Sequence, residues 1–195
     1  VPVVMGNSQV KADKRSRYTS VAGVGPGAAQ AWKLSVASGS FLPTEDFTTG
    51  RALAVLGSEL KEELFGDANA LGQFVHIGGN RFRVVGVLAS KGEFLGTDLD
   101  DMIYVPAARA LQMFNRSSLM EVDIFYSTGT PTAEISARVK QLLIRRHGFE
   151  DFTLVTQDQM LATMDNILRI LKFAGAGLGA ISLLVGAVGI TTILT

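Results

Sequence analysis

The sequence predicts an α+β fold, in which a mixed sheet with helices on one side is followed by one long C-terminal helix. Three observations indicate this. Two alternating segments flank a tight turn within 73–88, a strand–helix–strand order runs from Glu121 to Val155, and the last segment, 173–195, contains no charged residue. Strict alternation of polar and apolar residues is typical of half-buried strands, whereas helices repeat with a longer period.

The elements expected before residue 60 are short. Residues 16–26 form an apolar stretch that ends in Gly-Val-Gly-Pro-Gly, and we expect a short helix near 27–33 and a strand near 33–37 after it. A turn-rich connector from Gly39 to Asp46 leads to a compact strand at Leu53–Leu56. The glycine-rich stretch lacks the GxGxxG spacing, and its proline removes a backbone donor that a phosphate would need, so we interpret it as a turn.

The middle of the chain contains a helix and a hairpin with recognisable end signals. Ser58 is expected to cap a helix at Glu59–Phe65, and Gly66 to end it. Gly78-Gly79-Asn80 supplies turn chemistry between strands at Gln73–Ile77 and Arg81–Leu88. The remaining elements expected here are a loop at 90–101, a strand at Met102–Val105 and a helix from Pro106 to about Phe114.

A βαβ-like run follows. Strands are expected at Glu121–Tyr126 and Phe152–Val155. Between them, Thr130 is expected to cap a helix that begins at Pro131 and ends near His147, before Gly148. The apolar residues of this helix fall on one face: Ile135, Val139, Leu142 and Leu143.

The last helix is expected to begin near Asp158, because Thr156 and Gln159 fit a capping box. Nothing breaks it before Thr195, so it would be about 57 Å long. Its uncharged part, 173–195, would measure about 34 Å, enough to cross a bilayer core of about 30 Å. We therefore expect a truncated transmembrane span at 173–195 below a stalk, in a fragment of a larger membrane protein. The alternative is a buried helix of a soluble protein, but such helices rarely run so long without a polar face.

One face of this helix is predicted to pack against a neighbouring helix. Apolar residues in the stalk follow 3-4-3 spacing, and small residues continue it at 4-3-4-3 spacing in the uncharged part. Small residues in register allow helix backbones to approach closely in lipid. The predicted helix-packing residues are Leu161, Met164, Leu168, Leu171, Gly175, Gly179, Ser182, Gly186 and Gly189.

We expect no catalytic, metal or cofactor site in this chain. Asp98, Asp100 and Asp101 lack the order of a calcium-binding loop and are interpreted as a solvated loop. His76 and His147 have no companion at metal-ligand spacing. The basic run of Lys11, Lys14, Arg15 and Arg17 is interpreted as a solvated loop, with contact to lipid headgroups or a partner as the alternative.

Several short motifs resemble the periplasmic core domain of MacB-type ABC transporter permeases. Their order over residues 50–195 is more specific than any one of them, whereas 1–49 resemble the family only loosely. The last run is similar to the start of the FtsX-like permease domain. The motifs are Ala54-Val55-Leu56-Gly57, Glu63-Leu64-Phe65-Gly66, Leu71-Gly72-Gln73-Phe74-Val75, Phe82-Arg83-Val84-Val85-Gly86-Val87, Ile103-Tyr104-Val105-Pro106, Arg146-His147-Gly148, Asp151-Phe152 and the run Ile181 to Ile190.

This resemblance implies a domain organisation. Residues 1–157 would be the periplasmic core domain, with a porter-like βαβ subdomain at about 1–45 plus 119–157 and an inserted, mostly β subdomain at about 46–118. Residues 158–195 would be the stalk and the second of four transmembrane helices. The soluble domain would lie on the periplasmic or extracellular side of the inner membrane.

The resemblance also implies a function. The chain would be the permease part of an ATP-driven efflux pump for drugs, peptides or other substrates, and it would act by mechanotransmission. Its partners would be a second permease in a homodimer or pair, a fused or separate nucleotide-binding domain that holds ATP and Mg²⁺, membrane lipid, and in efflux members a periplasmic adaptor and an outer-membrane channel. Two alternatives stay open: a lipoprotein-releasing or cell-division FtsX-like permease, and a membrane-anchored sensor or binding module without transport.

Overall fold

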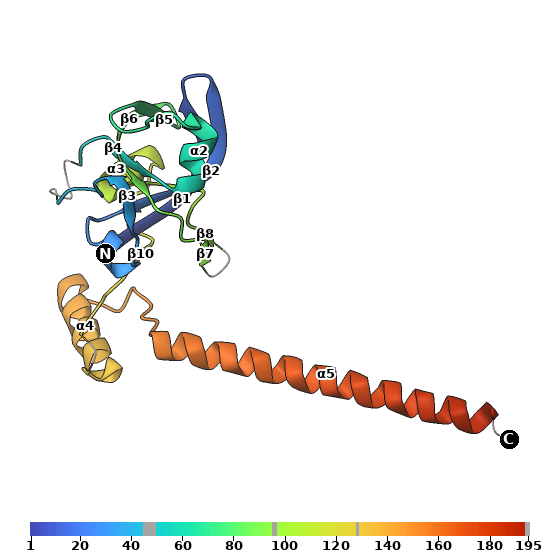
Figure 1. Cartoon of the computed structure of the whole chain (residues 1–195). Helices are drawn as coiled ribbons and strands as arrows, with labels where there is room; N and C mark the ends of the chain where they lie inside the picture. The colour runs from blue at the N-terminus through green and yellow to red at the C-terminus, as the bar shows by residue number, and fades with distance from the viewer. Residues whose placement is uncertain (45–49, 95–96, 128, 194–195) are drawn as a thin grey trace. The chain divides into compact units, whose positions relative to one another are not determined.

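The computed structural model describes residues 1–44, 50–94, 97–127 and 129–193, without the side chains of residues 94, 97, 181 and 183–193. The chain divides into two compact units, Val1–Phe125 and Tyr126–Thr195. Figure 1 shows strands and short helices in the first unit and two helices in the second. The mixed α/β class expected from the sequence is confirmed.

Six strands of the first unit form a closed ring. The ring closes because β5 pairs with both β1 and β6, although it meets β1 at only two residue pairs, Val10–Ile77 and Lys11–His76. Neighbours are antiparallel except for the β2–β9 and β4–β6 pairs, which are parallel. In ring order the strands are β1 (Pro2–Ala12), β2 (Arg15–Val24), β9 (Met102–Pro106), β4 (Leu53–Leu56), β6 (Asn80–Leu88) and β5 (Phe74–Ile77).

Three further pieces of β-structure extend this ring. The short strand β10 (Glu121–Val122) pairs with the start of β1, and β3 (Val36–Gly39) pairs with the end of β6. A separate small hairpin is formed by β7 (Glu93–Phe94) and β8 (Thr97–Asp98). The expected strand at Glu121–Tyr126 is therefore shorter in the structure, and the expected loop at 90–101 contains this hairpin.

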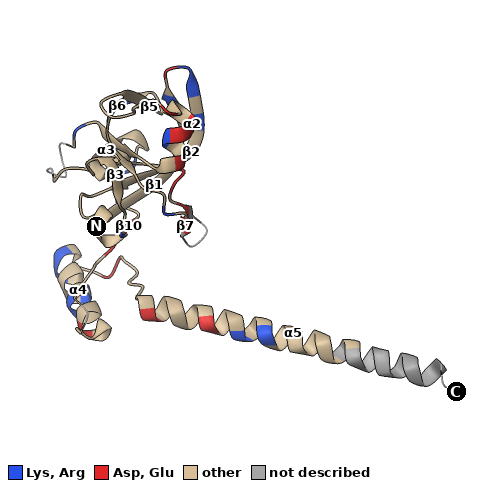
Figure 2. Ribbon diagram, viewed as in Figure 1, with Lys and Arg blue, Asp and Glu red and all other residues tan. Residues whose placement is uncertain are grey.

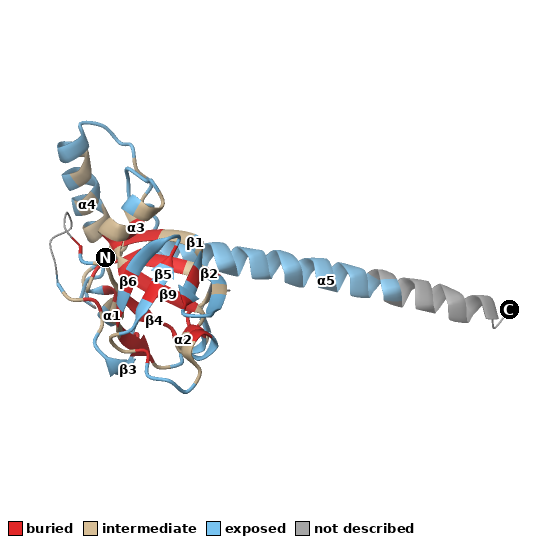
Figure 3. Cartoon of the chain, turned by 90° about the horizontal axis from the view of Figure 1, so that it is seen from above, coloured by how far each residue is buried: buried red, intermediate tan, exposed pale blue. Residues whose placement is uncertain are grey.

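The first unit has two apolar clusters, on opposite sides of the strands. Alternation explains this arrangement, because successive residues of a strand point to opposite faces. In β4, for example, Ala54 and Leu56 belong to one cluster and Val55 to the other. The first cluster includes Val10, Ile77 and Phe82, and the second includes Tyr104 and Met102. Figure 3 shows the buried residues concentrated on these strands.

Three short helices cover the strands. They are α1 (Ala28–Ala31), α2 (Ser58–Phe65) and α3 (Ala107–Met113). Leu60 and Leu64 form the buried stripe of α2, and Gly66 ends it at φ +57°, as expected. Gly57, not Ser58, is the N-cap of α2, because the carbonyl of Asp100 accepts the backbone N–H groups of Glu59 and Leu60 at 3.1 and 3.2 Å.

The second unit contains α4 (Thr132–His147) and α5 (Gln157–Ile193). Gly148 ends α4 in the left-handed conformation at φ +86°, as the sequence predicts. Thr130 does not cap α4, whose N-cap is Pro131 without a side-chain hydrogen bond. The expected strand at 152–155 is wrong, because no strand pairs with this segment in the part of the chain that is described.

The helix α5 runs without interruption from Gln157 to Ile193, which confirms the continuous helix expected over these residues. The end of the expected helix, 194–195, lies outside the described residues. A search of the described part of the chain found no helix both long and apolar enough to cross a membrane. Most of the expected span at 173–195 lies outside the side chains that the structure describes.

Candidate helix-packing surface and polar clusters

The first turn of α5 is closed by a reciprocal pair of hydrogen bonds. The backbone N–H of Gln159 donates to Thr156 Oγ1 at 3.2 Å, and the backbone N–H of Thr156 donates to Gln159 Oε1 at 3.2 Å. This is the capping box that the sequence predicts, and it satisfies donors that a helix start leaves unpaired. The beginning of α5 is thus fixed locally, independently of any partner.

Beyond this cap, α5 presents an exposed apolar seam. We define the seam as Leu161, Met164, Leu168 and Leu171, which are between 48% and 61% exposed. Ile167 and Met160 are exposed beside it. A helix in a protein gains most of its stability when its apolar face packs against other elements. The exposed seam therefore needs a partner to cover it.

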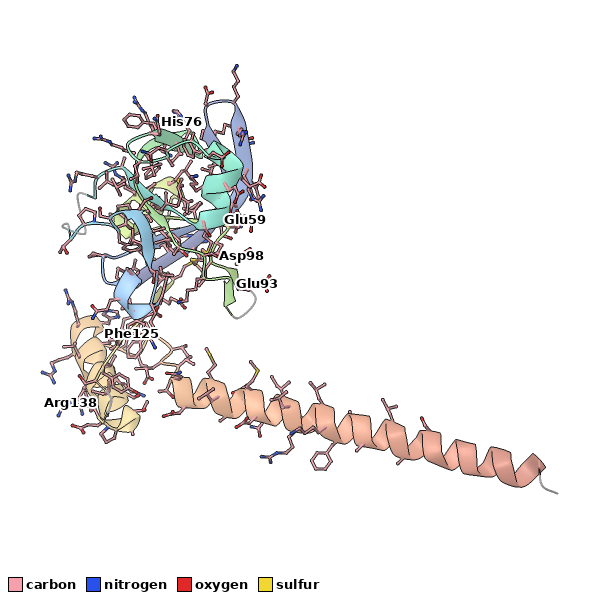
Figure 4. All side chains as sticks on the ribbon, viewed as in Figure 1. Glu59, His76, Glu93, Asp98, Phe125 and Arg138 are labelled. Atoms are coloured by element: carbon pink, nitrogen blue, oxygen red, sulfur yellow. The ribbon has the colours of Figure 1, made fainter. Side chains whose placement is uncertain are left out.

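The charges of α5 form a separate face that adjoins the seam. Asp158, Asp165, Arg169 and Lys172 follow one another at spacings of seven, four and three residues, which places them on one face at about 100° per residue. Figure 2 shows these charges in the first half of the helix. In Figure 4 the sulfur-bearing side chains project from one edge of α5 and nitrogen-tipped ones from the other. The stalk part of α5 is therefore amphipathic.

The small residues continue the seam toward the C-terminus. A Cβ added at Gly175 or Gly179 would meet no atom within 4 Å, so both positions are open to a neighbouring helix. Ser182 Oγ donates to the carbonyl of Leu178 at 3.0 Å, so the hydroxyl donor is satisfied within the helix. Gly186 and Gly189 lie outside the residues whose side chains are described. The packing role of all nine residues stays a prediction.

The aspartates at 98–101 do not form the solvated loop that the sequence suggests. Asp100 is only 8% exposed, and its carboxylate accepts hydrogen bonds from Ser90 Oγ at 2.5 Å and from the backbone N–H groups of Lys91 and Gly92 at 2.8 and 2.9 Å. Burial alone would raise the pKa of Asp100, but these hydrogen bonds, with one from Ser58, outweigh it and hold the pKa below its ordinary value. Asp100 therefore fastens loop 90–92 to the start of α2.

A second polar cluster surrounds Arg17 on β2. Arg17 Nε and Nη2 lie 2.9 Å from the two carboxylate oxygens of Asp101, and Nη2 lies 2.8 Å from Glu59 Oε1. Glu63 approaches the same guanidinium at 3.5 Å. The hydrogen bond to Asp101 raises the pKa of Arg17 despite partial desolvation. The cluster joins β2, α2 and the start of β9, so Arg17 has a structural role and does not belong to a solvated basic loop.

The other residues considered from the sequence also have local roles. His147 Nδ1 lies 2.7 Å from Asp151 Oδ1, and this hydrogen bond lowers the pKa of Asp151. His76 is exposed on β5. No group of three or more metal-ligating side chains occurs among the described residues. A Cβ on Gly23 would lie 2.1 Å from Ala110 Cβ, so the glycine lets α3 pack directly on β2.

Sequence reasoning missed the strand β1 and the buried position of Asp100. Its sequence carries only a short signal at the end of the strand, where the apolar residues Val10 and Ala12 alternate with Lys11. Asp100 gave no local signal, because its partners are Ser90, Lys91 and Gly92 in the preceding loop.

The sequence of this chain is similar to a family profile and to proteins that are named as export ATP-binding/permease proteins. The profile of the MacB-like periplasmic core domain matches residues 1–142. The chain is 32% identical over 161 residues to the macrolide export ATP-binding/permease protein MacB of Marinobacter nauticus, which covers 82% of this chain and 25% of that protein. It is 31% identical over 198 residues to the pyoverdine export ATP-binding/permease protein PvdT of Pseudomonas entomophila, which covers 100% of this chain and 30% of that protein.

Solved structures share the fold. The periplasmic region of MacB from Actinobacillus actinomycetemcomitans matches with a TM-score of 0.69 at 22% identity, and the match covers 85% of this chain and 74% of that one. The extracellular domain of the ABC-type transporter YknZ from Gram-positive bacteria matches with a TM-score of 0.65 at 21% identity, over 77% and 76% of the two chains. At these identities the structures support the fold alone. The profile match includes residues 1–49, where the motif resemblance was loose, and with the curated relatives it shows that the chain belongs to the MacB-like periplasmic core domain family.

Proposed function

We propose that this chain is the permease portion of an ATP-driven ABC exporter, with its first unit on the periplasmic or extracellular side of the membrane. The family match and the names of the two export ATP-binding/permease relatives support this. The chain spans 25–30% of the length of those relatives, so export itself is a proposal for this protein. The exported substrates would be drugs, peptides or other compounds.

The mechanism we propose is mechanotransmission through α5. The observation that supports it is the unbroken helix from Gln157 to Ile193, which measures about 55 Å. No proline interrupts it, and a capping box fixes its beginning. A continuous helix transmits displacement better than a jointed one, and a rigid element with two positions is what coupling between distant sites requires. Movement at one end of α5 would thus displace the other.

The uncharged segment 173–195 would be the membrane-embedded part of this helix. Its sequence contains only aliphatic residues, Gly, Ser, Thr and one Phe. At about 1.5 Å per residue it matches a hydrocarbon core of about 30 Å. The charged residues that precede it, Arg169 and Lys172, would lie at or above the headgroups of the inner membrane.

The proposed second permease rests on the exposed seam, and the other proposed partners rest on the family match and on the names of the relatives. A second permease would cover the seam and the small residues below it, giving a homodimer or a pair of permeases. A fused or separate nucleotide-binding domain would hold ATP and Mg²⁺, and we propose no catalytic site in this chain. In a two-membrane cell, a periplasmic adaptor and an outer-membrane channel would complete the exporter.

The test compares two glycines of α5 in the full-length transporter. Gly179→Leu places a large side chain on the predicted packing stripe, whereas Gly177→Leu makes the same change on another face, and neither glycine has a neighbour within 4 Å. This chain has no cysteine, so in a cysteine-free background of the full-length transporter Leu171→Cys supplies a single site for disulfide crosslinking between permeases. We expect Gly179→Leu to weaken helix association by about 1–2 kcal/mol, which lowers crosslinking and ATP-coupled export several-fold.

The control must behave differently. Gly177→Leu is expected to leave crosslinking and export near the wild-type level, and both variants should keep the thermal transition of the first unit. Equal effects of the two substitutions, or unchanged export in Gly179→Leu, would remove the packing face from the proposal. Export that continues after ATP is withheld would contradict the proposed ABC exporter function.

A further inference from the structure

The outer face of β1, β5 and β6 carries a group of basic side chains that the proposed export mechanism does not use. We define the basic face as Lys11, His76, Arg81 and Arg83, together with the aromatic ring of Phe74. All five side chains are exposed, while the residues that alternate with them, Val10, Val75, Ile77, Phe82 and Val84, are buried. Figure 4 labels His76, the central residue of this face, on β5.

Strand register brings these basic side chains next to one another. Lys11 is the register partner of His76, and His76 is the register partner of Arg81, so the three lie in one row across β1, β5 and β6. Phe74 and Arg83 are paired in the next row. Directly opposed side chains on one face of an antiparallel pair lie about 5 Å apart, so Lys11 and Arg81 flank His76 on either side. The register therefore gathers basic side chains on one exposed face.

The basic face forms no ion pair within the part of the chain that the structure describes. Among the described residues, none of Lys11, Arg81 and Arg83 forms an ion pair, in contrast to Arg17, which contacts Asp101, Glu59 and Glu63. The guanidinium of Arg81 instead lies 3.5 Å from the centroid of the Phe74 ring, which is 43% exposed. Stacking fixes the plane of the guanidinium and leaves its N–H donors available at the edge.

We propose that the basic face is a docking surface for an acidic segment of a partner protein. A guanidinium held flat presents a rigid fork that matches a carboxylate through two parallel hydrogen bonds. Arginine and aromatic side chains are enriched at protein–protein interfaces, whereas lysine is depleted. Three permanent cations are fewer than the four to eight that are typical of anionic lipid recognition, so the composition favours a protein partner over a membrane surface.

Binding of a carboxylate probe tests this proposal directly. Fluorescein-labelled oligoglutamate is titrated into the purified full chain in detergent, and anisotropy is measured at about 50 and 200 mM salt. We expect Arg81→Glu and Arg83→Glu each to raise Kd about tenfold, and Lys11→Glu to raise it less. The matched control is Arg116→Glu, which reverses an exposed arginine outside this face and should leave Kd unchanged.

Two further measurements separate the outcomes. Arg81→Lys keeps the charge but loses the planar fork, and we expect it to weaken binding about threefold while thermal unfolding shows that every variant is folded. Two competing probes are tested separately: vesicles that contain anionic phospholipid, and inorganic polyphosphate in solution. The proposal is overturned if oligoglutamate does not bind, or if Arg116→Glu weakens its binding as much as Arg81→Glu does. It is also overturned if the binding of vesicles or polyphosphate depends on Arg81 while the binding of oligoglutamate does not.

Discussion

Replacing Asp100 by asparagine should lower the unfolding free energy of the first unit markedly. The Asp100 carboxylate accepts three hydrogen bonds at 2.5, 2.8 and 2.9 Å, and its residue is 8% exposed. Asparagine replaces one carboxylate oxygen, which accepts hydrogen bonds, with an NH2 group, which donates them. This NH2 group would then face the backbone N–H group of either Lys91 or Gly92, each of which is a donor as well. One charge-assisted hydrogen bond is lost and one buried donor is left unpaired, which costs about 3 kcal/mol in unfolding free energy.

The measurement is thermal unfolding followed by near-ultraviolet circular dichroism. For a unit of this size, about 3 kcal/mol corresponds to a decrease in Tm of roughly 10 °C at neutral pH. Asp67→Asn is the matched control, because Asp67 is exposed and its removal should change Tm by less than about 2 °C.

The pH dependence supplies a sharper test of the same residue. The folded-state pKa of Asp100 is lowered, so its stabilisation is fully present above the unfolded pKa of about 4 and is lost as the pH falls through the folded value. The difference in stability between wild type and Asp100→Asn should therefore be largest near neutral pH and shrink below about pH 4. Equal Tm values at pH 7, or a difference that does not change with pH, would refute the role assigned to the carboxylate.

Two other substitutions test the packing and the capping. Gly23→Ala places a Cβ 2.1 Å from Ala110 Cβ, so α3 must move away from β2, and we expect a loss of about 2–3 kcal/mol in chemical denaturation; a loss below about 0.5 kcal/mol would contradict the close contact. Thr156→Ala removes the capping box of α5 and should cost about 1 kcal/mol of helix stability, seen as faster amide hydrogen exchange in the first turn, while unaltered exchange would argue against the cap.

The elements that the sequence predicts well are those with strong local signals. The β5–β6 hairpin needs positive φ at Gly78 and Gly79, and both glycines adopt it, at +55° and +88°. The strand β4 and the continuous helix α5 likewise depend on patterns within a few neighbouring residues. For α5, the periodicity, the capping box and the absence of proline are all contained in its own sequence.

The elements that the sequence predicts poorly depend on partners distant in the chain. Ser58 has the chemistry of a cap, yet the carbonyl of Asp100 takes that place, and Gly57 allows the approach because a Cβ there would lie 2.2 Å from this oxygen. The segment 152–155 has strand-like residues, but a strand also requires a neighbour to pair with. The pairing of Arg17 with Asp101 arises in the same way, because the parallel pairing of β2 with β9 brings distant parts of the chain together.

The division into subdomains stays a prediction. The sequence resemblance implies a subdomain at about 1–45 plus 119–157 with 46–118 inserted, whereas the structure divides the chain into Val1–Phe125 and Tyr126–Thr195. In the structure β1 and β2 share one closed ring with strands from the proposed insertion, and β10 joins the same sheet through β1. Limited proteolysis of the full-length protein would show which boundary is opened first.

A spin-label distance along α5 is the most direct test of the lever mechanism. A cysteine-free background of the full-length protein is labelled at Gln157→Cys and Leu178→Cys, which leaves the capping box intact. Labelled permease is mixed with an excess of unlabelled permease, so that distances between two permeases do not contribute, and is measured in lipid nanodiscs by double electron–electron resonance with and without ATP. A continuous helix places these two positions about 32 Å apart, and we expect one narrow distance distribution near that value in both states. Two populations, or a distance that changes when ATP binds, would show a hinge within α5 and contradict its action as a rigid rod.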